Sequence, residues 1–205
     1  MNIYGGGIFG GTASRSSYTL ATRPSAAAVP VGTRIFVTDA GAYGHWFISN
    51  GAYWNPIGEY LLYSKTAAES SHTGTTNETL IRSIPIPALT LRNNGTIRGQ
   101  ITWSFTNSAD DKVLRVRLGG IAGTAFVSRT VTTNAAGIIE FTVSNRDAAN
   151  SQIGGPAVGV GIGENNSVAV TSSVDTTAAT TLDITAQLEN AANAITIQRT
   201  LIYVS

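Results

Sequence analysis

The sequence predicts an all-β protein with an N-terminal extended arm, a small β-hairpin module and a C-terminal jelly-roll-like β-sandwich. Two observations predict this class. Short apolar runs alternate with polar residues over much of the chain, and Gly, Asn and Pro separate these runs at intervals typical of strands. Helical spacing of apolar residues is absent, and the one helix-compatible stretch, residues 187–194, is too short to compete with its flanking strands.

The first part, residues 1–33, is rich in Gly, Ser, Ala and Thr and carries only isolated aromatic residues. Such a segment has too little apolar surface to form a core alone, so we expect an arm that becomes ordered against another protein. Charge in the arm is minimal, and anchoring would rest on backbone pairing and on burial of apolar side chains. The candidate anchoring residues are Tyr4, Ile8 and Phe9.

The second part, residues 34–64, is predicted to be a small aromatic β-hairpin module and contains two of the three tryptophans. Asn50-Gly51 predicts a hairpin, because the left-handed dihedral angles of a type I′ turn suit these two residue types. So short a module buries little surface. Trp46, Tyr53 and Trp54 are therefore expected to supply most of its core.

Residues 65–79 have almost no apolar content and the small, polar composition of a linker. We therefore predict a domain boundary in this segment.

The last part, residues 80–205, shows about eight strand patterns, the number expected of a jelly roll or a related two-sheet sandwich. Trp103 falls in one of the predicted inward rows and is assigned to the core. The strands at 156–163 and 167–171 combine apolar and small residues, which predicts a subunit interface. The predicted inward rows are Ile97, Ile101, Trp103 and Phe105; Leu114, Val116 and Leu118; Ile139, Phe141 and Val143; Leu182, Ile184, Ala186 and Leu188; and Ile195, Ile197, Leu201 and Tyr203.

Composition argues against several kinds of partner and cofactor. The chain has no cysteine, which excludes disulfides and thiolate metal sites. Charged residues make up 12% of the chain and the net charge is +1, so we expect no nucleic-acid partner. No apolar run approaches the ~18 residues of a membrane span, and no signal peptide is recognised, so we expect no membrane insertion.

Few side chains are candidates for catalysis. His45 and His72 lie in different segments without a motif around them, and structural roles are expected for both. Asp110 and Asp111 lie in a stretch with the composition of a turn, where adjacent acids are usually solvated. A second carboxylate for glycoside cleavage could only be guessed among Glu140, Glu164 and Asp175. We predict no enzyme, no catalytic residue, no metal and no cofactor.

The hairpin segment resembles a short module of tailed-bacteriophage virion proteins such as tail fibres and head fibres. The resemblance lies in residues 34–39, 46–58 and 61–64, with a similar lead-in at 20–25 and 29–32. It implies that the module joins a virion-attachment arm to a distal β domain. It also implies a protein made in the host cytoplasm and located in the virion, and a homotrimer that contacts other virion proteins through its arm.

Three functions follow as hypotheses. The first is a short tail fibre whose sandwich binds a host receptor, a surface glycan or protein. The second is a capsid decoration or head-fibre protein that stabilises the head. The third is a polysaccharide depolymerase, which would depend on Asp110, Asp111 or Glu140.

Overall fold

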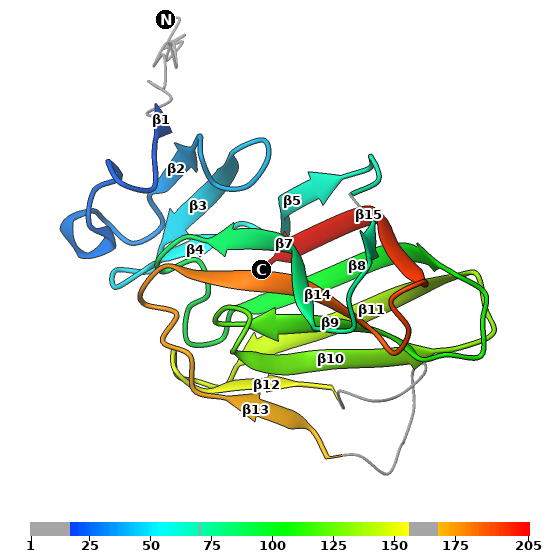
Figure 1. Cartoon of the computed structure of the whole chain (residues 1–205). Helices are drawn as coiled ribbons and strands as arrows, with labels where there is room; N and C mark the ends of the chain where they lie inside the picture. Colours follow the sequence, from blue (N-terminus) through cyan, green and yellow to red (C-terminus); the bar gives the residue numbers. More distant parts are fainter. Residues whose placement is uncertain (1–16, 70, 156–167) are drawn as a thin grey trace, which may run out of the picture. The chain divides into compact units, whose positions relative to one another are not determined.

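The structure is a computed structural model that describes residues 17–69, 71–155 and 168–205 (Figure 1). These residues form two compact units, a smaller unit (Met1–Ile57) and a larger unit (Gly58–Ser205). The described part is nearly all β, with one 3-10 turn, η1 (Ala26–Ala28), which confirms the predicted class. No helix in the described ranges is long and apolar enough to cross a membrane.

The smaller unit is one four-stranded sheet in the order β1-β2-β3-β4. β1 runs parallel to β2, and the other neighbours are antiparallel. Side chains alternate between the two faces, so one face forms the core while the other meets solvent. The strands are β1 (Ser17–Tyr18), β2 (Arg34–Val37), β3 (His45–Ser49) and β4 (Trp54–Pro56). The buried residues are Ala26, Ile35, Val37, Ala40, Phe47, Ser49 and Trp54.

The connection between β3 and β4 differs from the predicted two-residue turn. Gly51 has a positive φ of 88°, but Asn50 does not share it, whereas a type I′ turn requires positive φ at both residues. The Asn50 side-chain oxygen instead accepts hydrogen bonds from the backbone N–H groups of Ala52 and Tyr53, at 3.0 and 2.7 Å. The carboxamide thereby stabilises a longer loop, as Asx turns do.

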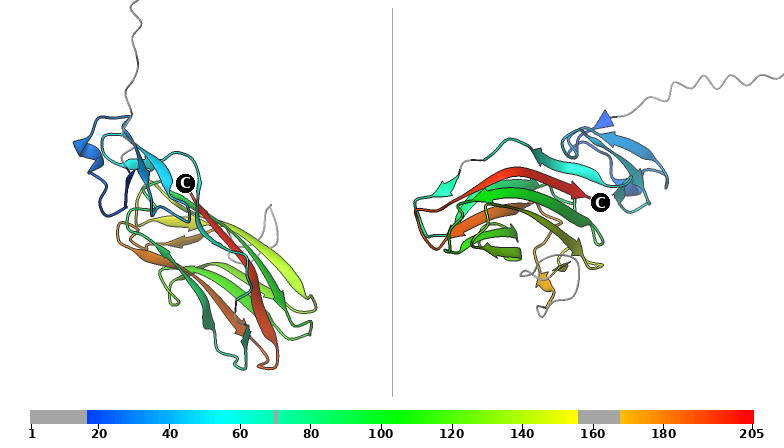
Figure 2. Two further views of the ribbon diagram at one scale, coloured as in Figure 1. Left: turned by 90° about the horizontal axis from the view of Figure 1, so that it is seen from above. Right: turned by 90° about the vertical axis from the view of Figure 1, so that its right-hand side faces the viewer.

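The larger unit is a two-sheet sandwich with the strand order of a jelly roll (Figures 1 and 2). Of its eight principal strands in chain order, the first, eighth, third and sixth lie side by side in one sheet. The second, seventh, fourth and fifth lie side by side in the other. This interleaving is produced by two Greek keys, which define the jelly roll. The eight strands are β5 (Tyr60–Lys65), β7 (Thr79–Ile86), β8 (Thr96–Phe105), β9 (Lys112–Leu118), β10 (Thr124–Val131), β11 (Ala136–Asn145), β14 (Thr180–Leu188) and β15 (Ala194–Val204).

Three short strands extend the larger of these two sheets. β12 (Gln152–Gly154) pairs with β11, and β13 (Val170–Ser172) pairs with β12. β6 (His72–Thr73) pairs with the start of β15. The full sheet order is β13-β12-β11-β8-β15-β5, with β6 beside β15, and the second sheet has the order β10-β9-β14-β7.

The core between the two sheets contains most of the predicted inward rows. Trp103 is fully buried, as predicted, and the centroid of its ring lies 4.6 Å from the ring centroid of Phe105. Gly99 leaves room for the ring of Phe141 on the neighbouring strand, since a Cβ there would lie 2.2 Å from ring atoms. The predicted residues that are buried are Ile97, Ile101, Trp103, Phe105, Leu114, Val116, Leu118, Ile139, Val143, Leu182, Ile184, Ala186, Leu188, Ile195 and Ile197.

The last predicted row is wrong at its end. β15 is irregular in its pairing with β8 between Ile197 and Arg199, so one extra residue enters the strand. A one-residue shift moves every following side chain to the opposite face. Ile202 and Val204 are therefore buried in place of the predicted Leu201 and Tyr203.

The boundary between the units also differs from the predicted one. β5 lies within the predicted hairpin module, yet it pairs with β15 and is the first strand of the jelly roll. The predicted linker, residues 65–79, runs along the same strand, since the Glu69 backbone N–H donates to Ile197 O and β6 follows. The jelly roll needs this edge strand, which explains why the smaller unit ends at Ile57 rather than at residue 64.

Two glutamates fix this edge segment by ion pairs. Glu69 accepts hydrogen bonds from Lys65 and Arg82. Glu78 accepts from Arg115 and Arg117 at 3.0 and 2.8 Å. Each carboxylate thus contacts two cations, so the segment is bound to both sheets.

Candidate functional site: a polar depression at one end of the larger unit

The structure describes the predicted core residues of the hairpin module but not the predicted anchoring residues. Tyr4, Ile8 and Phe9 lie outside the described residues. Trp54 is 3% exposed, and its indole N–H donates to Pro24 O at 2.8 Å.

Trp46 and Tyr53, in contrast, are 38% and 53% exposed, which corrects the predicted core. Trp46 points away from the core because it precedes the buried Phe47, and neighbouring strand residues face opposite sides of a sheet.

His45 lies in the smaller unit and His72 lies in the larger unit. His45 Nε2 lies 3.1 Å from Ile57 O. His72 is buried on β6, where its Nδ1 lies 2.7 Å from the Thr79 hydroxyl and its Nε2 has no hydrogen-bond partner. Burial lowers the pKa of His72, because desolvation disfavours the charged imidazolium.

The acidic candidates are dispersed. Asp110 accepts a hydrogen bond from the Asn193 amide at 2.8 Å, and Asp111 directly precedes β9. Glu140 pairs with Gln100 on the outer face of the larger sheet, and Asp175 binds Thr177 in a turn. Glu164 lies outside the described residues. The described residues also hold no group of three or more His, Cys, Asp or Glu placed to bind a metal.

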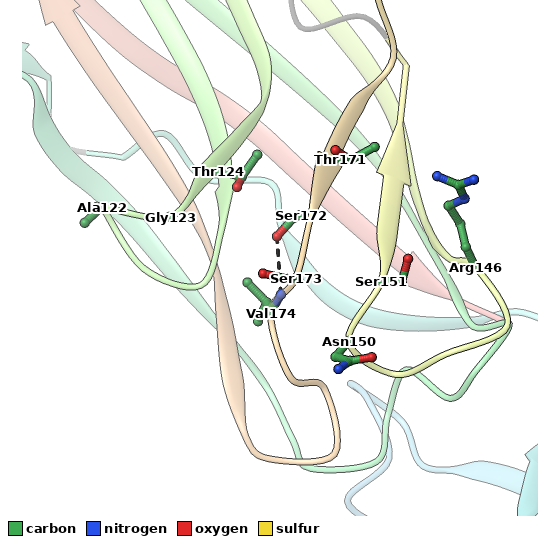
Figure 3. A pocket seen from close by; sticks show the side chains of 10 residues that line it. All are labelled: Ala122, Gly123, Thr124, Arg146, Asn150, Ser151, Thr171, Ser172, Ser173 and Val174. Atoms are coloured by element: carbon green, nitrogen blue, oxygen red, sulfur yellow. Dashed lines mark hydrogen bonds between the residues drawn. The ribbon is translucent and has the colours of Figure 1, made fainter.

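A polar depression of about 670 Å³ is a candidate binding site (Figure 3). Three connections of the larger unit line it: β9–β10, β11–β12 and β13–β14. This is the end at which the chain enters the unit, since Tyr60 pairs with Val204 at the end of β15. The lining residues are Ala122, Gly123, Thr124, Arg146, Asn150, Ser151, Thr171, Ser172, Ser173 and Val174.

Buried Gln152 supports one wall of the depression. Its Oε1 accepts the backbone N–H of Val174 at 3.0 Å, and its Nε2 donates to Val174 O at 2.9 Å. The same Nε2 lies 2.9 Å from the side-chain oxygen of Asn145. The fully buried Gln152 amide thus binds both backbone groups of Val174 and fixes the β13–β14 connection at this residue.

Asn145 and Thr176 extend this network to a further connection. Asn145 Nδ2 donates to Arg92 O at 2.6 Å in the β7–β8 connection. It also lies 2.9 Å from the Thr176 hydroxyl, which donates to Ala149 O at 2.7 Å. Asn145, Gln152 and Thr176 are each at most 5% exposed, and hydrogen bonds satisfy their polar atoms. Such a network rigidifies the β7–β8, β11–β12 and β13–β14 connections that it joins.

Several side chains that line the depression form no hydrogen bond or ion pair within the described structure. Within the described structure, no side-chain hydrogen bond or ion pair engages Arg146, Asn150, Ser151, Thr171 or Ser173. The lining contains one guanidinium and no carboxylate, imidazole or aromatic ring. This arrangement offers hydrogen-bond donors to a polar ligand but no acid or base for general acid–base catalysis.

Sequence reasoning did not find this site. Its lining comes from residues 122–124, 146–151 and 171–174, which lie far apart in the sequence and share no motif. A signal was present in the Ser- and Asn-rich turns, but only the strand order shows that these turns meet at one end of the sandwich.

Comparisons with known proteins define no family for the chain. No family model matches it, and no curated protein does. Among solved structures, it is similar to infectious bursal disease virus, Gx strain, with 12% identity and a TM-score of 0.36, over 79% of this chain and 41% of that chain. A crystal structure of the VP2 subviral particle of the same virus gives 10% identity and a TM-score of 0.35, over 78% of this chain and 42% of that chain.

The chain thus spans about two fifths of the length of these viral chains. The strand order of the larger unit by itself defines its jelly roll.

Proposed function

We propose that this chain is a structural protein of a virus particle, and more specifically a short tail fibre of a tailed bacteriophage. In this proposal the N-terminal arm attaches the protein to the particle, and the jelly roll is displayed to recognise a host-surface receptor. The protein is located in the virion, has no enzymatic activity and forms a homotrimer.

The observation that carries the proposal is the order of the two units. The smaller unit includes most of the sequence that resembles the module of tailed-phage appendages. It is followed at Gly58, without an intervening linker, by a complete jelly roll. Viral structural proteins and lectins are among the proteins that use this fold. A fold does not by itself define a function, so the proposal depends on the two units together.

Exposed apolar side chains of the larger unit support an oligomer. Ile138 and Val168 are 64% and 86% exposed on the single chain. A contact between copies of the chain would remove this apolar surface from water, which is favourable by about 25 cal/mol per Å². A trimer would cover them, and the mass of the purified protein in solution tests this directly.

Incorporation into particles tests the attachment. Full-length protein and a variant lacking residues 2–16 are added to phage particles that lack the protein. This deletion ends before β1, so both units keep all the strands of residues 17–205 that the structure describes. We expect the full-length protein to co-sediment with particles and the variant to stay in the supernatant as a folded oligomer. Incorporation of the variant to the same level would contradict the attachment role.

A second assay separates display from catalysis. The proposal predicts that host polysaccharide incubated with the protein releases no reducing ends. Release that is lost on Asp110→Asn, Asp111→Asn or Glu140→Gln would identify a depolymerase instead. A protein that joins particles and raises their resistance to heat, but ignores host cells, would be a capsid decoration protein.

A further inference from the structure

We propose that the polar depression binds an acidic saccharide, a sugar unit that carries a carboxylate. Arg146 is the anchor for the carboxylate, and the surrounding hydroxyl and amide groups bind the sugar hydroxyls. The inference deepens the proposed function by naming the class of receptor, and it rests on that function only in assigning the sugar to a host surface.

The hydrogen-bonding groups of the lining fit a sugar. Five residues with hydroxyl side chains, together with Asn150, line the depression, and hydroxyl and amide groups both donate and accept hydrogen bonds. Saccharides present hydroxyls that do the same. A nucleobase would need an aromatic or planar partner to stack on, and the lining contains no aromatic ring. The hydroxyls are Thr124, Ser151, Thr171, Ser172 and Ser173, of which Ser172 lies 3.4 Å from the Val174 backbone N–H.

The charge of the lining favours an anionic ligand. Arg146 is exposed, and its planar guanidinium matches a carboxylate with two parallel hydrogen bonds. Two acids lie next to lining residues in the sequence. Asp175 accepts hydrogen bonds from the Thr177 backbone and hydroxyl, so its carboxylate is engaged. Asp147 follows Arg146 directly and is exposed, so its charge weakens the attraction of Arg146 for an anion.

The buried hydrogen-bond network of Gln152, Asn145 and Thr176 explains how an open site can be selective. The volume of about 670 Å³ lies within the range of small-molecule sites, roughly 300–1,000 Å³. Since Gln152, Asn145 and Thr176 fix two of the three connections, little order has to be gained on binding. We expect millimolar affinity for a single sugar, because water competes at an open site, and stronger binding to a polymer through avidity.

The test is a titration of the full-length protein, followed by NMR shifts of the depression residues. The probes are the methyl glycosides of glucuronic acid, galacturonic acid and sialic acid, with glucose and galactose as neutral probes. We expect saturable shifts with at least one acidic sugar and at least tenfold weaker binding of its neutral counterpart. No saturable shift with any of the three acidic sugars would overturn the inference.

Three substitutions make the test specific. Arg146→Gln is expected to weaken binding of the acidic sugar about tenfold and to leave the neutral sugar unchanged. Asp147→Asn is expected to strengthen acidic-sugar binding, and Asn tolerates the left-handed backbone at this position (φ 55°). Arg34→Gln removes an exposed arginine of the smaller unit and should change nothing. Equal loss of both sugars in Arg146→Gln would overturn the carboxylate assignment.

Two further measurements separate related explanations. If inorganic phosphate binds the depression more tightly than every acidic sugar, the site is an anion site and the saccharide assignment is wrong. Binding of the same preparation to intact host cells is measured in parallel. Cell binding without acidic-sugar binding would overturn this inference and leave the proposed function standing. Sugar binding without cell binding would overturn the proposed receptor recognition and leave the saccharide site standing.

Discussion

At the scale of single residues, buried polar side chains fix the loops more directly than the apolar core does. Gln152 is fully buried and forms hydrogen bonds to Val174 and Asn145. A buried polar group that loses its partner costs about 1–3 kcal/mol. A single amide can therefore hold a connection in place without any contribution from charge.

We expect Gln152→Leu to destabilise the larger unit by about 3 kcal/mol, because the Val174 backbone groups and the Asn145 amide lose their partner. Urea unfolding followed by circular dichroism measures the change. Gln100→Ala is the control, since the Gln100 hydrogen bond to Glu140 lies on the surface. Equal effects of the two substitutions would show that the buried network does not stabilise the loops.

Tryptophan burial in the smaller unit gives a second prediction at this scale. Trp54→Ala should destabilise the smaller unit by about 3–5 kcal/mol, because it removes a buried ring and the hydrogen bond to Pro24 O. Trp46→Ala should have a much smaller effect, since Trp46 is 38% exposed. NMR signals of the smaller unit report its folding in each variant. If Trp46→Ala unfolds the smaller unit and Trp54→Ala does not, Trp46 and not Trp54 is the core tryptophan.

At the scale of elements, the edge segment between β5 and β7 depends on charge. Burial raises the pKa of Glu78, but hydrogen bonds from Arg117 and Thr185 and the charges of Arg115 and Arg117 outweigh it and lower the pKa overall. Glu69 behaves in the same way, with burial opposed by Arg82 and Lys65. Both carboxylates therefore favour the folded state only while they are ionised.

The lowered pKa values of Glu69 and Glu78 predict that the larger unit loses stability in acid. A carboxylate with a lowered folded-state pKa contributes stability above its unfolded pKa of about 4.5, and this is lost as the pH falls through the folded value. The free energy of unfolding should therefore decrease from pH 5 to pH 3. The double variant Glu69→Gln, Glu78→Gln should be less stable at pH 7 and show a shallower decrease. An unchanged slope in the double variant would refute the role of these pairs.

The same scale shows what sequence reasoning could and could not predict. Alternation placed Leu114, Val116 and Leu118 on the buried face, because these residues lie in a regular strand. It failed after Ile197, because an irregular pairing that is set by the neighbouring strand leaves no local signal. The segment at 65–79 was misread for a related reason. Its polar side chains pair with distant Arg82, Arg115 and Arg117, and composition alone resembles a linker.

At the scale of the whole molecule, the class and the sandwich could be predicted, whereas the unit boundary and the depression required the strand order. β5 is the first strand of the jelly roll although its sequence continues the hairpin module. The depression exists because three connections, distant in sequence, meet at one end of the larger unit. Site residues of this kind have no spacing that a sequence pattern could reveal.

The boundary gives a prediction at this scale. A fragment of residues 58–205 should fold alone, since it retains all eight jelly-roll strands. A fragment of residues 66–205, which lacks β5, should aggregate or unfold at lower temperature, because β15 then has an exposed edge. Thermal unfolding of both fragments provides the comparison. Equal stability would show that the unit does not begin at Gly58.

The measurement that tests the central claim most directly is competition for phage adsorption by the purified full-length protein, with its mass in solution determined on the same preparation. The account predicts a trimer that binds host cells saturably and blocks adsorption of the phage that carries it. A protein that neither binds cells nor reduces adsorption, while it still associates with particles, would contradict receptor recognition.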